Sequence, residues 1–306
     1  MKIDFRLPFK TLAAWRTDEK ARKLSSSGGL ASAISEAWIR KGGVVYGAAF
    51  VRPFNFQHIR CTCVEELDRL RGSKYVQSSI TGIQKLIDKD VENKLDVLFI
   101  GTPCQVAGIK VQFGDKVSTI DIICHGTPKV EMLQESIPYS VQEMDYDRID
   151  FRDCGKFQLS FKKEGNIIWS RPLRTDLYMK GFFTATFYRE CCYSCRYAQK
   201  ERVSDITLGD FWGLDETAVG TTMAKGISLV LVNTINGEAL LSLVGNEIKF
   251  VERPLSEAVA GNNQLQHPMR RTWRNIVFKF WYPKVGFKWA AIMSMPELYL
   301  KGLLIR

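Results

Sequence analysis

Four cysteines placed next to short apolar segments constrain the fold of this chain more than any other feature. Cys104 and Cys124 each follow an apolar run that reads as a buried strand. Cys192 and Cys195 form a Cys-x-x-Cys pair just ahead of a third run, and this spacing brings two thiolates to one metal centre. Parallel strands end at one edge of a sheet, where ligand-binding side chains collect. We therefore expect the four cysteines to meet at one site.

The residues alone do not determine which metal group the four cysteines would bind. Four thiolates suit a [4Fe–4S] cluster and a structural zinc ion equally well, and spacing does not separate the two. Cys191 stands beside Cys192 and is an alternative ligand at that position. Cys61 and Cys63 are two apart, so on a strand they face the same way, and packing on one sheet face explains them best.

Composition favours a globular cytoplasmic protein. The chain has 306 residues, 45% of them hydrophobic, which is enough for a large core. No run of about 18 apolar residues occurs, and the first residues lack the apolar block of a signal peptide. In a reducing compartment, eight cysteines are better explained as metal ligands or redox thiols than as disulfides.

The pattern of apolar residues predicts an α/β fold. Strands and amphipathic helices alternate up to about residue 145, the last of these helices being expected at 132–144. Residues 148–170 instead read as antiparallel strands with a hairpin turn, and a helix is expected after them at 176–188. We expect a mixed sheet with helices on its faces and an antiparallel β-rich subregion. The predicted division is an N-terminal arm (1–24), a first ligand-binding region (25–145), the rest of the catalytic domain (146–262) and a basic aromatic C-terminal tail (263–306).

Two polar segments have the composition of ligand-binding loops. Residues 25–29 read Ser-Ser-Ser-Gly-Gly and precede a predicted helix at 30–40, whose first N–H groups would favour an anion. Residues 71–78 read Arg-Gly-Ser-Lys-Tyr-Val-Gln-Ser, which suits a phosphate or an electron-rich ring. A capped helix without a ligand and a solvated turn explain the same residues.

Six motifs in this order together resemble one protein family, the coenzyme F420 hydrogenase/dehydrogenase beta-subunit family. The similarity runs from about Ala13 to Asn233. The motifs are the segments 25–29 and 71–78, Gly-Thr-Pro-Cys-Gln at 101–105, Asp-Ile-Ile-Cys-His-Gly at 121–126, Cys-Tyr-Ser-Cys at 192–195 and Asp-Ile-Thr-Leu-Gly-Asp-Phe-Trp-Gly at 205–213.

The resemblance implies FAD and a [4Fe–4S] cluster, with Cys104, Cys124, Cys192 and Cys195 as cluster ligands. Lys74 is the expected partner of the reduced flavin ring or of a phosphate. His125 would hydrogen-bond a cluster sulfur, although a satisfied core histidine explains it equally well. The flavin contacts implied by the family are Ser26, Ser27, Gly28, Gly29, Gly72, Ser73, Lys74, Tyr75 and Gln105.

The implied activity is that of an oxidoreductase that passes electrons between a partner redox protein and a small soluble acceptor. Relatives often carry an N-terminal ferredoxin-like module, and none precedes Ala13, so we expect a separate, ferredoxin-like donor or acceptor protein. The main alternative is a zinc-stabilised interaction protein of the same fold without a redox role. A cysteine nucleophile paired with His125 is disfavoured, because adjacent residues on a strand point apart.

The C-terminal 41 residues carry most of the net positive charge. From Gln266 to Arg306 there are eight basic residues and one acid, Glu297, a balance of 8 − 1 = +7 out of a total of +10. Tryptophan and phenylalanine residues lie between these charges. The pattern suits the inner face of a membrane or a partner protein, and a solvated chain end explains it as well. No nucleic acid is expected, because no recognised nucleic-acid module accompanies the charge.

Overall fold

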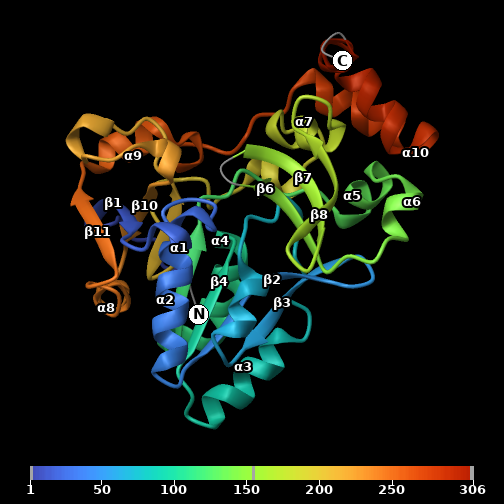
Figure 1. Cartoon of the computed structure of the whole chain (residues 1–306). Helices are drawn as coiled ribbons and strands as arrows, with labels where there is room; N and C mark the ends of the chain where they lie inside the picture. Colours follow the sequence, from blue (N-terminus) through green and yellow to red (C-terminus); the bar gives the residue numbers. More distant parts are fainter. Residues whose placement is uncertain (1–2, 154–155, 304–306) are drawn as a thin grey trace.

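The computed structural model describes residues 3–153 and 156–303, and within them the chain forms two β-sheets with helices around them (Figure 1). The larger sheet has eight strands in the order β11-β1-β10-β9-β5-β4-β2-β3. Its strands are β1 (Lys10–Arg16), β2 (Val44–Val51), β3 (Asn55–Cys61), β4 (Val97–Gly101), β5 (Val117–Ile122), β9 (Ile206–Asp210), β10 (Ser228–Val232) and β11 (Ile248–Glu252).

The middle of this sheet is parallel and its two ends are antiparallel. Strands β2, β4, β5 and β9 run parallel to one another, while β3, β10, β1 and β11 are added antiparallel. This confirms the predicted α/β fold with a mixed sheet. The carboxyl ends of β4, β5 and β9 lie at the same edge, because neighbouring parallel strands end together.

Helices cover both faces of the larger sheet. Alternate strand residues point to opposite faces, so Val45 and Leu98 pack with α2 (Leu30–Arg40) and α8 (Ile235–Ser242). Their neighbours Val44 and Phe99 pack instead with α3 (Ile83–Glu92) and α4 (Pro103–Phe113). At the antiparallel end, α9 (Leu255–Gly261) covers β1 and β10.

The predicted antiparallel region is a separate three-stranded sheet. Its strands are β6 (Arg148–Asp153), β7 (Lys156–Lys163) and β8 (Asn166–Pro172). Glu164 and Gly165 join β7 to β8 with positive φ values of 50° and 81°, as a two-residue hairpin turn that matches the twist of its strands requires. This sheet packs in one aromatic-rich core with three helices, α5 (Val130–Ser136), α7 (Leu177–Phe183) and α10 (Trp273–Ser294).

Three predicted segments differ from the structure. The N-terminal arm contains β1, which lies between β10 and β11 and is buried on both faces, so its residues show no alternation. The helix expected at 132–144 is two short helices, α5 (Val130–Ser136) and α6 (Tyr139–Gln142), because Pro138 cannot continue the first. The helix expected up to residue 188 ends sooner, as α7 (Leu177–Phe183).

The C-terminal region is folded rather than a loose tail. Helix α10 (Trp273–Ser294) bends at Gly286, which has a φ of 71°, and α11 (Pro296–Leu303) follows it. Phe278 and Phe287 of α10 are buried against Phe187, so this helix completes the aromatic-rich core beside the three-stranded sheet. Among the described residues, no helix is both long enough and apolar enough to cross a membrane.

Candidate metal centre

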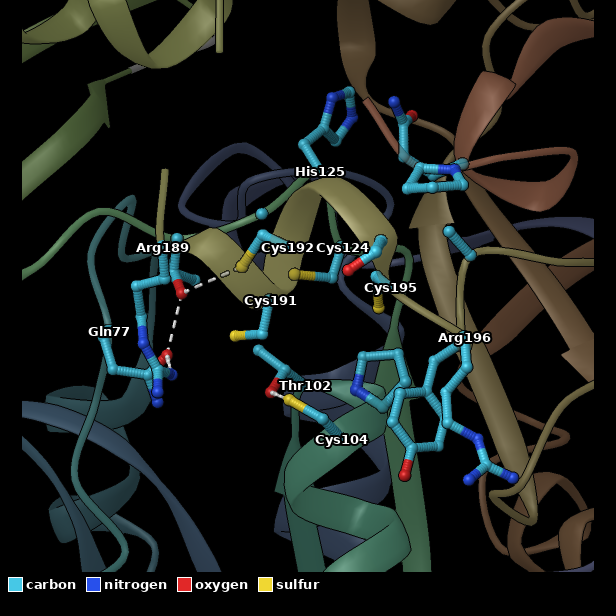
Figure 2. A pocket seen from close by; sticks show the side chains of 18 of the residues that line it. Gln77, Thr102, Cys104, Cys124, His125, Arg189, Cys191, Cys192, Cys195 and Arg196 are labelled. Carbon is cyan, nitrogen blue, oxygen red and sulfur yellow. Dashed lines mark hydrogen bonds between the residues drawn. The ribbon is translucent and has the colours of Figure 1, made fainter. Parts of the chain in front are cut away.

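Five cysteines from three separate segments line one pocket of about 280 Å³. Figure 2 shows their sulfur atoms gathered around one space. The five are Cys104, Cys124, Cys191, Cys192 and Cys195. All four cysteines predicted as ligands thus line one pocket, and Cys191 lines it with them.

Two of the cysteines reach the pocket from the edge of the parallel sheet. Cys104 lies in the first turn of α4, and Thr102 with Gln105 forms a capping box that fixes the start of this helix. The Thr102 hydroxyl lies 3.2 Å from the Cys104 sulfur. Cys124 follows two residues after the end of β5, the strand next to β4.

Cys192 and Cys195 lie in or directly after a short 3-10 helix (Glu190–Ser194). The loop behind them is held by Arg202, which donates hydrogen bonds to the carbonyl oxygens of Tyr197 (3.0 Å) and Gln199 (3.1 Å). Arg202 also forms a buried ion pair, 3.0 Å long, with Asp121 on β5. Through this arginine, the Cys-x-x-Cys loop is fastened to the strand that leads to Cys124.

Burial keeps most of these sulfurs as neutral thiols when no metal is bound. It raises the pKa of Cys124 well above its ordinary value, and the nearby Cys104, Cys192 and Cys195 raise it further. It also raises the pKa of Cys192 to about 11, and that of Cys195 in the same direction. A bound metal supplies the positive charge that deprotonates such thiols.

The spacing of the sulfurs bears on the choice between zinc and a cluster. A tetrahedral zinc ion with bonds of about 2.3 Å needs sulfur atoms about 3.8 Å apart. In the part of the chain that the structure describes, no three Cys, His, Asp or Glu side chains are grouped closely enough to hold a single ion. A cubane cluster carries its irons at separate corners and takes thiolates spaced more widely. The donor set of the pocket consists of cysteine thiols, which are the ligands of a [4Fe–4S] cluster and of a structural zinc ion alike.

Cations border the same pocket. Arg189, Arg196 and Arg202 contribute to its lining. Arg189 donates a hydrogen bond to the side-chain oxygen of Gln77 (2.9 Å), and Arg196 lies over the rings of Phe5 and Tyr197. These guanidinium groups can offset the negative charge of a thiolate-held cluster, since charge interactions are strong in a partly buried site.

The segment 71–78 joins the pocket to the serine- and glycine-rich segment. At one end, the backbone N–H of Ser73 donates to the hydroxyl of Ser26 (3.0 Å). At the other end, Gln77 lines the cysteine pocket and accepts a hydrogen bond from Thr127 (2.7 Å). Four residue steps of extended chain span at most about 14 Å, so the Cα atoms of Ser73 and Gln77, which border the two regions, lie within that distance.

The serine- and glycine-rich segment is packed tightly under the start of α2. Gly28 donates its N–H to the Ser228 hydroxyl (3.0 Å), and a Cβ at Gly28 would lie 2.3 Å from the Ala14 carbonyl oxygen. Gly29 has a φ of 87° and starts α2 without a side-chain cap. Ser27 donates its hydroxyl hydrogen bond to the Ile227 carbonyl (2.8 Å). Strands β1 and β10 thus fix this backbone.

In the neighbouring loop, Gly72 has a φ of 82°, and the half-buried Lys74 is bound by the chain itself. The Lys74 ammonium donates to the carbonyl oxygens of Leu70 and Arg71, both at 2.7 Å. Burial, with the positive charge of Arg148 adding to it, lowers the pKa of Lys74 to about 7. Tyr75 stacks on Phe182 with ring centroids 4.4 Å apart.

Gln105 and His125 are not directed at the sulfur atoms. Gln105 is buried, accepts from the Thr102 N–H (3.0 Å) and donates to the Ser78 carbonyl (2.9 Å). Figure 2 shows the imidazole of His125 on the far side of its loop from the sulfurs. Burial lowers the pKa of His125, whereas the charge of Asp210 acts in the opposite direction.

Comparison with known proteins identifies the family. Residues 11–85 match the family described as the N-terminal part of the coenzyme F420 hydrogenase/dehydrogenase beta subunit, and residues 95–258 match the family described as its C-terminal part. The chain belongs to the F420 hydrogenase/dehydrogenase beta-subunit family. This membership confirms the predicted resemblance and places the chain among oxidoreductase subunits.

A solved structure supports the fold. A chain of the F420-reducing [NiFe] hydrogenase complex from Methanosarcina barkeri is similar, with a TM-score of 0.57 and 18% sequence identity. The match covers 100% of the present chain and 94% of that chain. At this identity the likeness concerns the fold. No curated protein matches the sequence.

Both family matches contribute to the cysteine pocket, since Gln77 comes from the N-terminal match and all five cysteines come from the C-terminal one. The sequence motifs did not reveal the roles of Gln77, Arg189 and the Asp121–Arg202 pair. Gln77 lies inside the motif at 71–78, so the sequence could have indicated that this residue contributes to the site. Asp121 lies 81 residues away from Arg202 in the sequence, and only the folded chain brings the two together.

Proposed function

We propose that this chain holds FAD and a [4Fe–4S] cluster and passes electrons between a separate redox protein and a small soluble acceptor. The observation that carries the proposal is the pocket lined by five cysteines, connected by Gln77 and Ser73 to the segment at the start of α2. One short segment, from Ser73 to Gln77, borders both regions. The flavin and the cluster would therefore lie close enough to exchange electrons.

Cys104, Cys124, Cys192 and Cys195 are the proposed cluster ligands. When bound, the flavin supplies two-electron chemistry toward the acceptor and the cluster supplies one-electron steps toward the partner protein. The chain orients the ligands through the α4 capping box and through Arg202, which ties the Cys-x-x-Cys loop to Asp121. Arg189 and Arg196 offset the charge of the thiolates.

For the flavin, the support comes from the backbone more than from the side chains. The first N–H groups of α2 and the loop at 72–75 are proposed to contact it, with Ser26 and Ser73 in direct contact with each other. Lys74 is held beside this loop, with a pKa of about 7 that would let a nearby negative charge draw a proton to it. His125 lies on the Asp210 side of the pocket rather than among the sulfurs.

The proposed partner is a ferredoxin-like protein. The similar structure comes from a multi-subunit hydrogenase complex, in keeping with a beta subunit that works beside another redox protein. The proposed setting is the cytoplasm, because a reducing compartment keeps cysteines such as the seven free ones of the described residues as thiols. The proposal leaves the chemical identity of the acceptor to experiment.

The test is purification of the full chain without oxygen, followed by its visible spectrum and its metal and flavin content. We expect flavin absorption bands, a broad shoulder that bleaches with dithionite, and about four irons per chain. A colourless protein with one zinc per chain would instead establish the zinc-stabilised, non-redox alternative. Iron without flavin would retain the cluster and refute the flavin site.

A further inference from the structure

The C-terminal helices expose a row of large apolar side chains that the core does not use. We name this row, together with the cations beside it, the docking face. The buried side of α10 already supplies Phe278, Phe287 and Ala290 to the interior. On its outer side Ile276 is 67% exposed and Phe280 is 56% exposed. The apolar members of the docking face are Trp273, Ile276, Phe280, Trp289, Met293 and Leu300.

The charges of α10 are of one sign, and the acid of α11, Glu297, forms an ion pair with Arg274 of α10. No Asp or Glu occurs within Trp273–Ser294. Within the described ranges, Arg270, Lys284 and Lys288 are exposed and form no ion pair with a carboxylate. Lys284 lies over the Phe280 ring, 3.3 Å from its centroid, and Lys288 lies 5.6 Å from that of Trp289. Cations and aromatic rings therefore share one surface.

We propose that the docking face binds the surface of a membrane that contains anionic lipids. Aromatic and aliphatic side chains mixed with lysine are the composition of helices that lie in the membrane interface. There the ammonium groups stay among lipid phosphates while the rings enter the acyl boundary. A protein interface would have to cover these cations, and charged residues are depleted from the centre of such interfaces.

The position of the face in the molecule suits a flat surface. In Figure 1, α10 lies at an outer corner of the molecule, beyond the three-stranded sheet. Since no described helix can cross a bilayer, contact would be peripheral. The exposed side chains extend over 28 residues in two consecutive helices, so the contact would be distributed along the chain rather than made by a single anchor.

The docking face also adjoins the cysteine pocket. Gln264 and Pro268, just before α10, line the pocket. Glu190, next to Cys191, forms ion pairs with Arg271 and Lys279 on the C-terminal segment. Binding through α10 would therefore keep the pocket near the lipid surface, whatever the pocket holds.

The experiment is co-sedimentation of the full chain with phosphatidylglycerol-containing vesicles and with pure phosphatidylcholine vesicles at low salt. We expect clear binding to the first, weak binding to the second, and loss of binding as salt is raised. Lys284→Glu with Lys288→Glu should weaken binding by about 30-fold or more, the size expected for removing two lysine contacts with an anionic surface. Phe280→Ser should also weaken binding at low salt, because it removes an aromatic ring that would enter the acyl boundary.

Matched controls are available on α3, where Lys85 and Lys89 are exposed four residues apart and Leu86 is exposed between them. Lys85→Glu with Lys89→Glu changes the net charge equally, and Leu86→Ser removes a similar apolar group. If the control variants weaken vesicle binding as much as the test variants do, the proposal that the docking face binds the membrane is overturned. So would a wild-type chain that fails to bind phosphatidylglycerol vesicles, and that result would favour an acidic protein as the occupant. Circular dichroism verifies that each variant is folded.

Discussion

The cysteine pocket and the serine- and glycine-rich segment are both recognised by sequence motifs, but they differ in how the chain uses their polar groups. In the pocket, the sulfur atoms have few partners, among them the Thr102 hydroxyl at 3.2 Å from Cys104 and the Thr127 hydroxyl at 4.0 Å from Cys192. In the segment 26–29 and the loop at 72–75, the side chains and glycines bind other parts of the same chain.

This difference shows what each motif encodes. Thiols are weak hydrogen-bond groups, so a cluster of half-buried thiols keeps its ligating capacity for a metal. Serine and lysine side chains that already have hydrogen-bond partners, and glycines packed against the chain, instead fix a backbone shape. A ligand there would be recognised by backbone N–H groups and by its fit to that shape. Variants of the pocket should therefore affect the cofactor, and variants of the segment should first affect stability.

The largest expected effect is on the cysteine side. Cys124→Ser should reduce iron from about four per chain to near zero, because a hydroxyl replaces a thiolate ligand of the cluster. Cys63→Ser is the matched control, since Cys63 is also half-buried but lies outside the pocket. Iron analysis of anaerobically purified protein measures both. Full iron in Cys124→Ser would remove this residue from the ligand set.

The same assay distinguishes the adjacent pair. Cys192 is the proposed ligand and Cys191 the more exposed neighbour, and both line the pocket. We expect Cys192→Ser to lose the iron and Cys191→Ser to retain it. The reverse result would exchange their roles without changing the rest of the site.

The next largest effect tests the packing of the segment. Gly28→Ala places a Cβ 2.3 Å from the Ala14 carbonyl oxygen and 2.7 Å from the Ser228 nitrogen, both backbone atoms that cannot move freely. We expect a loss of about 3 kcal/mol or more in the free energy of unfolding. Gly108→Ala, on an exposed turn of α4 with nothing near its Cβ, should gain up to about 1 kcal/mol. Denaturant titration measures both, and equal effects would contradict the packing explanation.

Local patterns account for much of what was predictable. Helix α2 occupies the expected residues 30–40, because its apolar spacing and the preceding glycines mark both its face and its start. The approach of the cysteines was predictable because Cys104 and Cys124 follow parallel strands that pair with each other.

Long-range pairing accounts for what was not predictable. Strand β1 pairs with β10 and β11, more than 200 residues away, and nothing near residues 10–16 signals those partners. The use of Lys74 to bind carbonyl oxygens depends on the turn that the chain takes after Leu70. Composition alone could not separate that use from ligand binding.

A smaller effect concerns the pH dependence of stability. The pKa of Lys74 is lowered to about 7 by burial, while an unfolded chain has the ordinary value near 10.5. At pH values between about 7 and 10.5, Lys74 therefore binds more protons in the unfolded state than in the folded state. For this reason the contribution of Lys74 to the free energy of unfolding increases as the pH rises through this range. Relative to Lys74→Met, the wild type should gain about 1 to 2 kcal/mol in unfolding free energy between pH 7 and pH 9. Parallel pH profiles of the two proteins would contradict the lowered pKa.

The smallest expected effect concerns Gln105 and distinguishes between two roles of its side chain. The family resemblance implies that it contacts the flavin, whereas the structure shows that it caps α4. In the structure its side chain caps α4 through Thr102 and binds Ser78, so Gln105→Ala should lower the unfolding free energy by about 1 kcal/mol. Gln112→Ala, exposed on the same helix, should change it little. If capping is the whole role, flavin content per folded chain stays constant in both variants. Loss of flavin with unchanged stability would show that Gln105 contacts the cofactor and that its hydrogen bonds to the chain rearrange when the ring binds.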